Sequence, residues 1–402
     1  MSYSIGLSGL SVASKKIEVT SNNIANASTV GFKAGQLYFS QVLASSQSSS
    51  NSNSSSFGVG APLVLPQFSQ GTLNSTNNPL DLAINGDGFF QLRDGDSTAY
   101  TRDGQFLLDG EGYIGTPSGA RLQGFAVDAN GAVSTAIPID IKVGNTTIPP
   151  KPTSNAILKV NLDARNNLGV PAAFDLTDPS TYQTATSIPV HDSLGGEHVV
   201  SLYFVKGTAS QWEVFAASDG AQVGAGSIGT LNFMPDGQLD TTASPQPLSL
   251  TLPLTNPLTF NLDLTSSTAV SKNFAIIDTF DNGRASGSLT GYNVDSGGFI
   301  VGSFTNGATM QLAQVALATF NNTQGLRPLG SNGFAATGTS GAAKLGQPNS
   351  GSAGTIQAGA LENSNIDLTS ELVHMIEAQR IFQANAQSIK AQDVMLQTVT
   401  NL

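Results

Sequence analysis

Glycine spacing gives the first hint of chemistry in this sequence. Gly224, Gly226 and Gly229 are spaced like the glycines of a dinucleotide-binding loop. In such a loop a helix begins within the motif, and the N-terminus of that helix holds the pyrophosphate. Here the strand-like run Thr230–Met234 follows instead. We therefore interpret the three glycines as part of a hairpin loop.

Two aspartates raise the possibility of a calcium site. Asp94 and Asp96 are spaced like the first ligands of an EF-hand loop, which also needs Gly at its sixth position and Glu at its twelfth. The sixth position is Ala99 and the twelfth is Gln105. The segment is better explained as tight turns between strands, because Asp and Gly favour turns.

Other catalytic or metal-binding patterns are missing from the sequence. The three histidines, His191, His198 and His374, are too few and too widely spaced for a zinc site, and the chain has no cysteine. It also has no Gly-x-Ser-x-Gly nucleophile elbow and no Gly-Lys-Ser/Thr phosphate-binding loop. We therefore expect no catalytic residue, no metal and no cofactor, and the sequence indicates a structural protein and not an enzyme.

The elements available to position any site are mostly short strands. The chain has 402 residues, including 43 Gly and 18 Pro, and only 11% of its residues are charged. Apolar and β-branched runs alternate with turn residues, which is typical of β-structure. Strands are predicted at Leu82–Ile84, Phe89–Leu92, Gln105–Leu108, Leu122–Val127, Ile137–Val143, Leu158–Leu162, His198–Phe204, Trp212–Phe215, Leu248–Leu252, Phe260–Leu264, Phe299–Phe304 and Gln311–Thr319.

Charge and hydropathy exclude several partners. The 28 acidic and 17 basic residues give a net charge of −11, which disfavours nucleic acid and anionic membrane surfaces. No apolar run reaches the roughly 18 residues of a membrane span, and Met1–Ser14 has no basic residue ahead of its apolar positions. We expect neither membrane insertion nor a cleaved signal peptide, so an exported chain would need a dedicated route.

The N-terminal segment has the pattern of a helix with two apolar faces. Large residues repeat every seven positions, and small residues follow each of them three positions later. A second apolar set repeats by seven on a different side of the helix. The three sets are Tyr3, Leu10, Ile17 and Ile24; Gly6, Ala13, Thr20 and Ala27; and Ile5, Val12 and Val19.

The C-terminal segment predicts a long second helix. Asp367 precedes it as a possible cap, and no Gly or Pro occurs from Leu361 to Leu402. Its heptad positions are Leu368, Leu372, Met375, Gln379, Phe382, Ala386, Ile389, Asp393 and Leu396. The two helices could pack as a hairpin within one chain. We favour the alternative, in which these positions stay exposed, and the ends largely disordered, until the chain assembles with other subunits.

Composition divides the chain into nested parts. Ser45–Ser56 is rich in Ser and Asn, which is typical of a flexible linker. The Pro-rich stretch Ile148–Pro152 and the stretch Asp281–Gly287 are predicted to lead into and out of an inserted domain. We predict a terminal helical assembly domain (1–30 and 360–402), a connecting segment (31–70), a discontinuous β-domain (71–144 and 285–359) and an inserted outer β-domain (145–284).

Four stretches of the sequence resemble the signatures of the bacterial flagellar rod and hook proteins. They are SNNIANASTVGFK at Ser21–Lys33, LAINGDGFFQL at Leu82–Leu92, YTRDGQFLLDGEG at Tyr100–Gly112, and the segment from Gly359 to Leu402. The stretches occur in the order found in that family, at both ends of the chain and in the first part of the β-region. Ser45–Ser56 matches no motif of the family.

The resemblance implies a fold that is mainly β with long terminal α-helices, in which nested discontinuous β-domains accompany a coiled-coil-like pair of N- and C-terminal helices. Rod members are shorter, and hook members carry an extra domain in the middle. A chain of 402 residues is therefore similar to the hook members, which form the curved, torque-transmitting joint between basal body and filament.

The resemblance also implies a set of partners and an extracellular location. The partners are further copies of the chain, the axial proteins of the distal rod and of the hook–filament junction, the hook cap, and the flagellar type III export apparatus. The candidate subunit-interface residues, from both helices and the first signature, are Leu10, Ile17, Asn22, Asn23, Ile24, Asn26, Leu368, Leu372, Met375, Phe382, Ile389 and Leu396.

Two alternatives stay open at this point. One is a distal rod protein with an unusual insertion, which would form a straight polymer. The other is a β-rich surface adhesin or glycan-binding protein, which would need exposed aromatic side chains. The chain has one Trp and seven Tyr, which weakens the second alternative.

Overall fold

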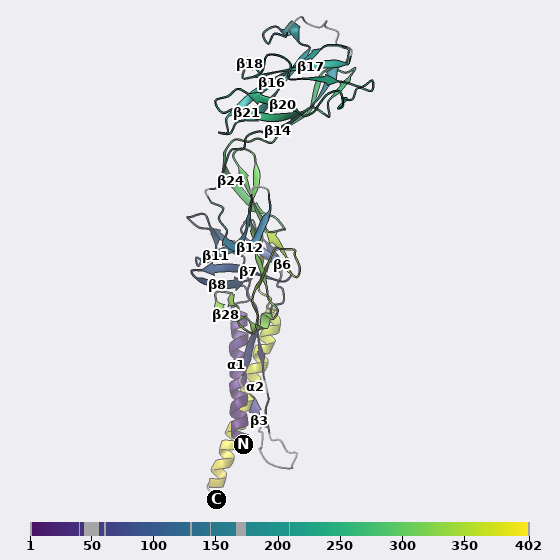
Figure 1. The fold of residues 1–402 in the computed structure, drawn as a ribbon. Coiled ribbons are helices and arrows are strands. Elements are labelled where there is room, and N and C mark those ends of the chain that lie inside the picture. Colours follow the sequence, from purple (N-terminus) through teal and green to yellow (C-terminus); the bar gives the residue numbers. More distant parts are fainter. Residues whose placement is uncertain are drawn as a thin grey trace, which may run out of the picture. The chain divides into compact units, whose positions relative to one another are not determined.

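The computed structural model describes residues 2–39, 41–43, 56–59, 62–128, 131–144, 146–165, 174–208 and 210–400 (Figure 1). Of the predicted linker Ser45–Ser56, only Ser56 belongs to these residues. The fold is mainly β with two long helices, α1 (Ser2–Ala25) and α2 (Leu368–Thr400), at the two ends of the chain. This confirms the predicted fold class. In the described part of the chain, neither helix is long and apolar enough to cross a membrane.

The chain forms two compact units, which are considered separately. The first unit comprises Met1–Gly144, Gly291–Gly302 and Thr309–Leu402, and the second comprises Asn145–Thr290 and Ser303–Ala308. Two strands, β24 (Gly287–Val294) and β25 (Phe299–Phe304), have residues in both units. The chain therefore leaves the first unit and returns to it, as a nested arrangement requires.

The first unit contains both helices and a sheet of short strands. Its strands are β1 (Gly35–Tyr38), β2 (Gln41–Leu43), β3 (Ser56–Val59), β4 (Leu63–Pro66), β5 (Leu73–Ser75), β6 (Leu82–Asn85), β7 (Phe89–Asp94), β8 (Ser97–Thr101), β9 (Leu107–Leu108), β10 (Ile114–Gly115), β11 (Arg121–Val127), β12 (Val133–Asp140), β26 (Thr309–Val315), β27 (Leu317–Thr319), β28 (Arg327–Gly330), β29 (Gly333–Ala335), β30 (Lys344–Gly346), β31 (Thr355–Ala358) and β32 (Ala360–Glu362).

Strands from the two ends of the sequence pair with each other in this unit. In its main sheet the order runs β25, β26, β11, β7, β8, β29, β28. Strand β31 pairs with β6, and β32 pairs with β5. Aromatic rings fill part of the core, where Phe89 packs edge-on against Phe68 and lies near Phe334, with ring centroids 5.2 and 6.2 Å away. The unit is thus complete only when residues before 145 meet residues after 290.

The turns that raised the question of ion or nucleotide binding are short connections. Residues Asp94 and Ser97 face each other across the β7–β8 hairpin, and Gly95 has a φ of +58°. In the second unit, strand β19 (Gly229–Asn232) begins at the last glycine of the candidate dinucleotide loop. The interpretation of the Asp94–Asp96 segment as a hairpin turn is confirmed. The interpretation of the three glycines as a hairpin loop is wrong, because their loop joins β18 (Ala221–Gln222) to β19, and these two strands each pair with β17 (Gln211–Ser218) and not with each other.

The second unit is built from two five-stranded sheets. One has the order β20 (Leu248–Leu252), β21 (Leu258–Asp263), β14 (Asn155–Asp163) and β22 (Thr268–Val270), with β23 (Ala275–Asp281) also paired to β14. The other has the order β15 (Thr184–His191), β16 (Glu197–Lys206), β17 (Gln211–Ser218) and β18 (Ala221–Gln222), with β19 paired to β17. A further strand, β13 (Thr147–Ile148), pairs with β24.

Alternation of apolar and polar residues explains the core of this second unit. In β20 the leucines at 248, 250 and 252 are buried, and Ser249 and Thr251 are exposed. Residues from both sheets join one cluster that includes Trp212, Phe204 and Phe260. The sheets therefore pack face to face, as expected when each has one apolar face.

The segment that leads into the second unit and the segment that leads out of it lie side by side. The amide of Lys151 donates to the carbonyl of Arg284 at 3.0 Å, and the amide of Arg284 donates back to Lys151 at 2.9 Å. These residues belong to or adjoin the stretches expected to lead into and out of an inserted domain. The boundaries of the predicted four-part division stay a prediction.

Candidate assembly interface

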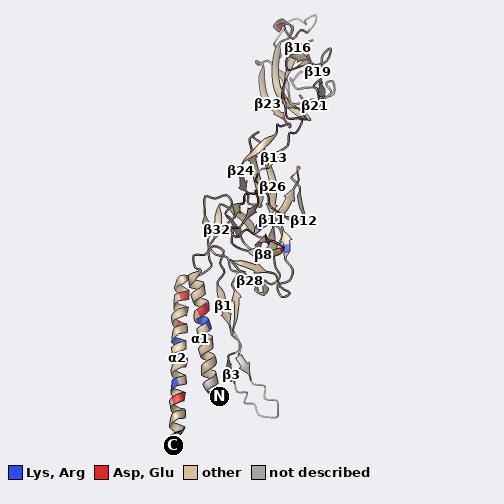
Figure 2. Cartoon of the chain, turned by 90° about the vertical axis from the view of Figure 1, so that its left-hand side faces the viewer, with Lys and Arg blue, Asp and Glu red and all other residues tan. Residues whose placement is uncertain are grey.

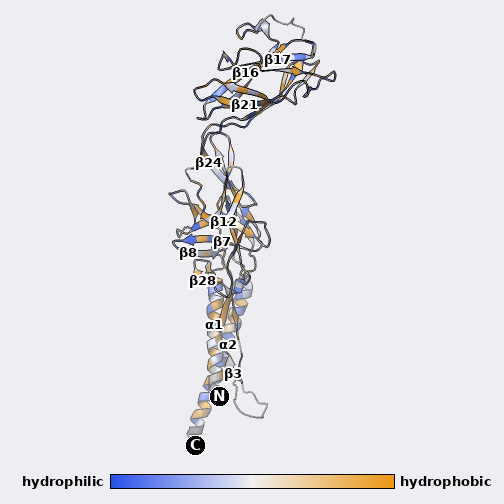
Figure 3. Cartoon of the chain, viewed as in Figure 1, coloured by the Kyte–Doolittle hydropathy of each residue, from blue (hydrophilic) through white to orange (hydrophobic). Residues whose placement is uncertain are grey.

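The two terminal helices pack against each other in antiparallel fashion (Figure 2). A Cβ atom built on Gly6 would lie 3.0 Å from Cγ1 of Ile389, and Lys16 Nζ lies 2.8 Å from Glu377 Oε2. As the α1 position advances from 6 to 16, its α2 neighbour therefore recedes from 389 to 377. Figure 3 shows that hydrophobic residues are distributed along both helices.

Small residues make this close packing possible. Of the small heptad set, Gly6, Ala13 and Thr20 on α1 are all buried, whereas Ala27 lies beyond the end of the helix and is half-buried. Ala378 on α2 is completely buried. Small side chains let two helix backbones approach each other, so larger neighbours can interlock around them. The large heptad residues Leu10, Ile17 and Ile24 are half-buried beside them.

The structure corrects the expectation that the α2 heptad positions stay exposed until assembly. Met375, Phe382 and Ile389 are half-buried in the single chain. They are covered because α2 packs antiparallel to α1, whose small residues leave room for these larger side chains. The hairpin alternative is therefore the one that the structure contains. Leu368, Leu372 and Leu396 differ, since they are 47%, 50% and 60% exposed.

The second apolar face of α1 is covered over part of its length. A Cβ atom on Gly35 of β1 would lie 3.5 Å from Cγ1 of Val19. The side chain of Asn23 holds the same strand, since its Nδ2 donates to the Gly35 carbonyl at 3.0 Å and its Oδ1 accepts from the Gly35 amide at 2.9 Å. At the other end of the face, Ile5 is 46% exposed.

Helix α2 extends past α1 at one end. It has 33 residues against 24 in α1, which is nine more. The start of α2 lies beside the end of α1, because Thr20, Asn23, Ser370 and Glu371 line one cleft. The extra residues therefore project beyond Ser2, by roughly 13 Å at 1.5 Å per residue. Val394, Met395 and Leu396 in this overhang are 61%, 66% and 60% exposed.

The three asparagines of the first signature have different places. Asn23 is buried and bonded to β1, as described above. Asn26 donates its side-chain amide to the Asn22 carbonyl at 2.9 Å, which stabilises the end of α1, and Asn22 is exposed. Asn23 thus has an internal structural contact, which the sequence could not distinguish from a subunit contact. The predicted cap at Asp367 is confirmed, because its side chain accepts from the Thr369 amide.

A buried ionic cluster, here called the ionic junction, joins the base of the helices to the sheet. It consists of Lys33, Arg102 and Glu362. Glu362 Oε1 lies 2.6 Å from Lys33 Nζ, and its Oε2 lies 3.3 Å from Arg102 Nη1. The side chains of Lys33 and Glu362 are completely buried. Burial lowers the pKa of Lys33 and of Arg102, and the carboxylate of Glu362 opposes that shift by favouring the charged forms.

The ionic junction brings together all four sequence stretches that resemble the flagellar family. Lys33 ends the first stretch, Arg102 lies in the third and Glu362 in the fourth. The second stretch contributes Gly86, whose carbonyl accepts from Arg102 Nη2 at 2.9 Å. The backbone also converges here, because the Gly31 amide donates to the Glu362 carbonyl at 2.7 Å. Gly31 has a φ of +69°, which suits glycine.

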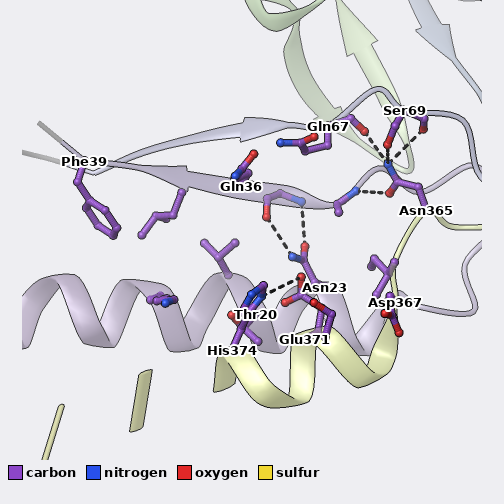
Figure 4. A pocket seen from close by; sticks show the side chains of 17 residues that line it. Thr20, Asn23, Gln36, Phe39, Gln67, Ser69, Asn365, Asp367, Glu371 and His374 are labelled. Atoms are coloured by element: carbon purple, nitrogen blue, oxygen red, sulfur yellow. Dashed lines mark hydrogen bonds and ion pairs between the residues drawn. The ribbon is translucent and has the colours of Figure 1, made fainter. Parts of the chain in front are cut away.

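A cleft of about 540 Å³ lies between α1, the start of α2 and strand β1 (Figure 4). Asn365 closes one side of it, since its Oδ1 accepts from the Ala34 amide at 2.8 Å and its Nδ2 donates to the Gln67 carbonyl at 2.8 Å. Polar side chains such as Glu371 and His374 line it from α2. His374 Nδ1 lies 3.9 Å from Glu371 Oε1.

The histidines do not converge. His198 lies 2.7 Å from Asp219 and 3.6 Å from Asp192, His191 lies 3.6 Å from Asp281, and His374 is on α2. Among the residues that the structure describes, no group of three or more His, Cys, Asp or Glu is arranged to hold a metal ion.

Protein-family models match most of the chain in four segments. They are "Flagella basal body rod protein" at residues 4–33, "Flagellar hook protein FlgE/F/G D1 domain" at 83–160, "Flagellar basal body protein FlaE D2 domain" at 161–284, and "Flagellar basal body rod FlgEFG protein C-terminal" at 357–402. The first and last segments cover α1 and α2.

Full-length relatives agree with these segments. The flagellar hook protein FlgE of Escherichia coli is 36% identical over 414 residues, covering 100% of both chains. That of Borreliella burgdorferi is 31% identical and covers 99% of this chain and 98% of its own. The crystal structure of Helicobacter pylori flagellar hook protein FlgE2 has a similar fold, with a TM-score of 0.51 at 15% identity over 72% of this chain and 100% of that one. Neither the rod protein nor the glycan-binding alternative is favoured.

Proposed function

The chain belongs to the flagellar hook protein family and is a subunit of the hook, and we propose that the α1–α2 pair carries its assembly. A hook subunit forms a homopolymer in the flagellar axis, outside the cell. The terminal helices would form the contacts between subunits, and the β-units would surround them. The polymer would then act as the curved joint that transmits torque from basal body to filament.

The exposed apolar overhang of α2 is the observation that carries this proposal. Val394 and Met395 are adjacent in sequence and therefore point to different sides of the helix. Both are more than half exposed, and no residue of α1 lies opposite them. Burying a side chain of this size stabilises a complex by about 1.5–3 kcal/mol. A neighbouring copy that covers the overhang would gain this energy at every contact.

A second group of exposed residues lies near the start of α2. Leu368, Leu372, Val373 and Ile376 are 47%, 50%, 61% and 52% exposed, so α1 leaves much of their surface uncovered. Together with the overhang they leave apolar surface at both ends of one helix. A contact between two different places on neighbouring copies extends into an open helical polymer when the rotation between copies does not close into a ring.

The candidate interface residues divide into two groups on this basis. Leu368, Leu372 and Leu396 would contact a neighbouring copy directly. The half-buried residues would hold the hairpin in the shape that a neighbour recognises, and Asn23 would fix α1 to β1. The half-buried group comprises Leu10, Ile17, Ile24, Met375, Phe382 and Ile389.

We also propose that the protein has no catalytic role. The support is that the full-length relatives of the chain are flagellar hook proteins, which are structural proteins. Its further partners would be the distal rod, the hook–filament junction proteins, the hook cap and the export apparatus.

Replacing Val394 and Met395 together by Ser tests the proposal. The critical concentration for polymerisation, measured by sedimentation, should rise at least about tenfold for each 1.4 kcal/mol of contact energy lost. The melting temperature of the monomer should stay unchanged, because both side chains are exposed there.

Ile137→Ser is a matched control, since Ile137 on β12 is 73% exposed and lies outside the helices. Its critical concentration should equal that of the unchanged chain. Polymerisation of the helix variant at the original concentration would rule out the proposed role of the overhang.

A further inference from the structure

Methionine is the only sulfur-containing residue in this chain. The sequence has five methionines and no cysteine, so an oxidant that attacks sulfur can react only with thioethers. Four of the five lie among the described residues. Met310 on β26 and Met375 on α2 are half-buried, whereas Met234 after β19 is 41% exposed and Met395 on α2 is 66% exposed. Met395 is therefore the most exposed methionine of the described part of the chain.

Met395 also lies in apolar surroundings. It belongs to the α2 overhang, where no residue of α1 lies opposite, and its neighbours Val394 and Leu396 are 61% and 60% exposed. Consecutive helical residues point about 100° apart, so these three side chains cover more than half of the helix circumference. An unbranched, polarizable thioether adapts to irregular surfaces. The sulfur of Met395 thus lies within the surface that a neighbouring copy would cover.

We propose that Met395 is an oxidation site that decides whether a free subunit can join the polymer, with a hydroperoxide as the oxidant. In the reaction the Met395 sulfur takes up one oxygen atom and is oxidised to a sulfoxide. The O–O bond of hydrogen peroxide breaks, and the peroxide is reduced to one molecule of water. The inference rests on the proposed role of the α2 overhang in assembly.

The sulfoxide would oppose assembly because it changes an apolar side chain into a polar one. Its oxygen accepts hydrogen bonds from water in the free subunit. Contact with an apolar surface removes that water and supplies no donor, which costs free energy. The folded subunit itself tolerates the change, because Met395 is exposed there. An oxidised subunit is therefore folded but unable to assemble at its usual concentration.

The same geometry restricts oxidation to subunits that have not yet assembled. In the polymer a neighbouring copy covers the overhang, so peroxide no longer reaches the Met395 sulfur. Susceptibility of methionine to oxidation follows exposure. Met375 differs, because it is half-buried beside α1 in the single chain and is already sheltered there. Oxidation at Met395 thus acts on the supply of subunits and leaves the finished joint intact.

Peptide mass spectrometry after peroxide treatment tests the position of the site. Monomer and polymer are given the same dose of hydrogen peroxide, and oxygen uptake is measured at each methionine. In the monomer Met395 should react severalfold faster than Met375, and in the polymer it should react at least about tenfold more slowly than in the monomer. Equal reaction of Met395 in monomer and polymer would contradict the proposed function itself. A monomer in which Met375 reacts faster than Met395 would overturn the oxidation site alone.

The critical concentration of oxidised subunits tests the consequence. Oxidation of the monomer should raise it at least about tenfold and leave the melting temperature unchanged. In Met395→Leu the ratio of critical concentrations after and before peroxide should be close to one, whatever the starting value. The control Met234→Leu, in the second unit, should keep the full ratio. Oxidised subunits that polymerise at the original critical concentration would overturn the inference and leave the proposed function in place.

Enzymatic reduction provides a further check. Two methionine sulfoxide reductases, one for each sulfoxide epimer, return the side chain to a thioether. Treatment of the oxidised monomer with both enzymes should restore the original critical concentration. The inference fails if the raised value persists after Met395 has been fully reduced, or if Met395→Leu remains as sensitive to peroxide as the unchanged chain.

Discussion

The two units of this chain are stabilised in different ways. The second unit has a continuous apolar core, formed by alternating residues of strands between Asn145 and Thr290. The first unit depends at its base on three charged side chains that come from opposite ends of the sequence, since Lys33 and Glu362 are 329 residues apart. The difference indicates that an apolar core can form from consecutive strands, whereas the helix-bearing unit needs both chain ends in place.

Two spectroscopic signals separate these regions. Trp212 is the single tryptophan of the chain and is buried in the core of the second unit. Its fluorescence therefore reports on that unit. The two long helices belong to the first unit, so helical circular dichroism reports on them. Each prediction below expects one signal to change and the other to stay constant.

The largest effect is expected at the ionic junction. Glu362→Gln would leave Lys33 and Arg102 buried without an anion, which typically costs about 3–5 kcal/mol. Helical circular dichroism should be lost at a much lower temperature, and the Trp212 transition should not move. In the control Glu111→Gln, an exposed pair with Arg121 is removed, and the cost should be at most about 1 kcal/mol. Equal shifts in the two variants would contradict the role assigned to the junction.

A smaller effect is expected between the two helices. Ala378 is completely buried where α2 meets α1, so Ala378→Leu would force the helices apart and destabilise the pair by about 1–3 kcal/mol. The exposed Ala384 on the same helix provides a control, and Ala384→Leu should change stability by no more than about 0.5 kcal/mol. If both variants melt like the original chain, the helices do not pack as described.

The smallest effect concerns pH and the second unit. The hydrogen bond from His198 to Asp219, assisted by Asp192, raises the pKa of His198 above its ordinary 6.5. A raised pKa in the folded state contributes stability at pH values below 6.5 that is lost as the pH rises through the folded value. The Trp212 transition should therefore fall slightly between about pH 6 and about pH 9.

The size of this pH effect should be about 1 kcal/mol or less, because the pair is partly exposed to solvent. His198→Asn should remove the dependence, and helical circular dichroism should show none of it. Asp192, Asp219 and Glu197 are the acidic residues beside the ring or next to it in sequence. A dependence that survives the substitution would have to come from another group.

Regular patterns made much of the fold predictable from the sequence. Leu248–Leu252 and Phe299–Phe304 were predicted as strands from their apolar runs, and β20 and β25 have the same bounds. The small heptad residues of α1 likewise predicted a face suited to close packing. These features depend on residues within a few positions of each other, which a sequence displays directly.

Long-range and irregular features could not be predicted in the same way. The ionic junction joins residues up to 329 positions apart. The sequence indicated it only indirectly, because Lys33, Arg102 and Glu362 are charged residues in a weakly charged chain and lie inside the stretches that resemble the flagellar family. The exposed strand β23, with sequence AIIDTFD, was not predicted, although its apolar run was visible. The intrachain hairpin was also set aside, because periodicity shows that a face will be buried but not by which partner.

Hydrogen exchange on the monomer and on the polymer would test most directly whether the α2 overhang carries assembly. Amides near Val394 and Met395 should exchange at least about tenfold more slowly in the polymer, because a neighbouring copy would cover a helix end that frays in the monomer. Amides of the central strands β14 and β16 should exchange equally slowly in both, since the core of the second unit is already closed. Equal exchange at the overhang in monomer and polymer would contradict the account.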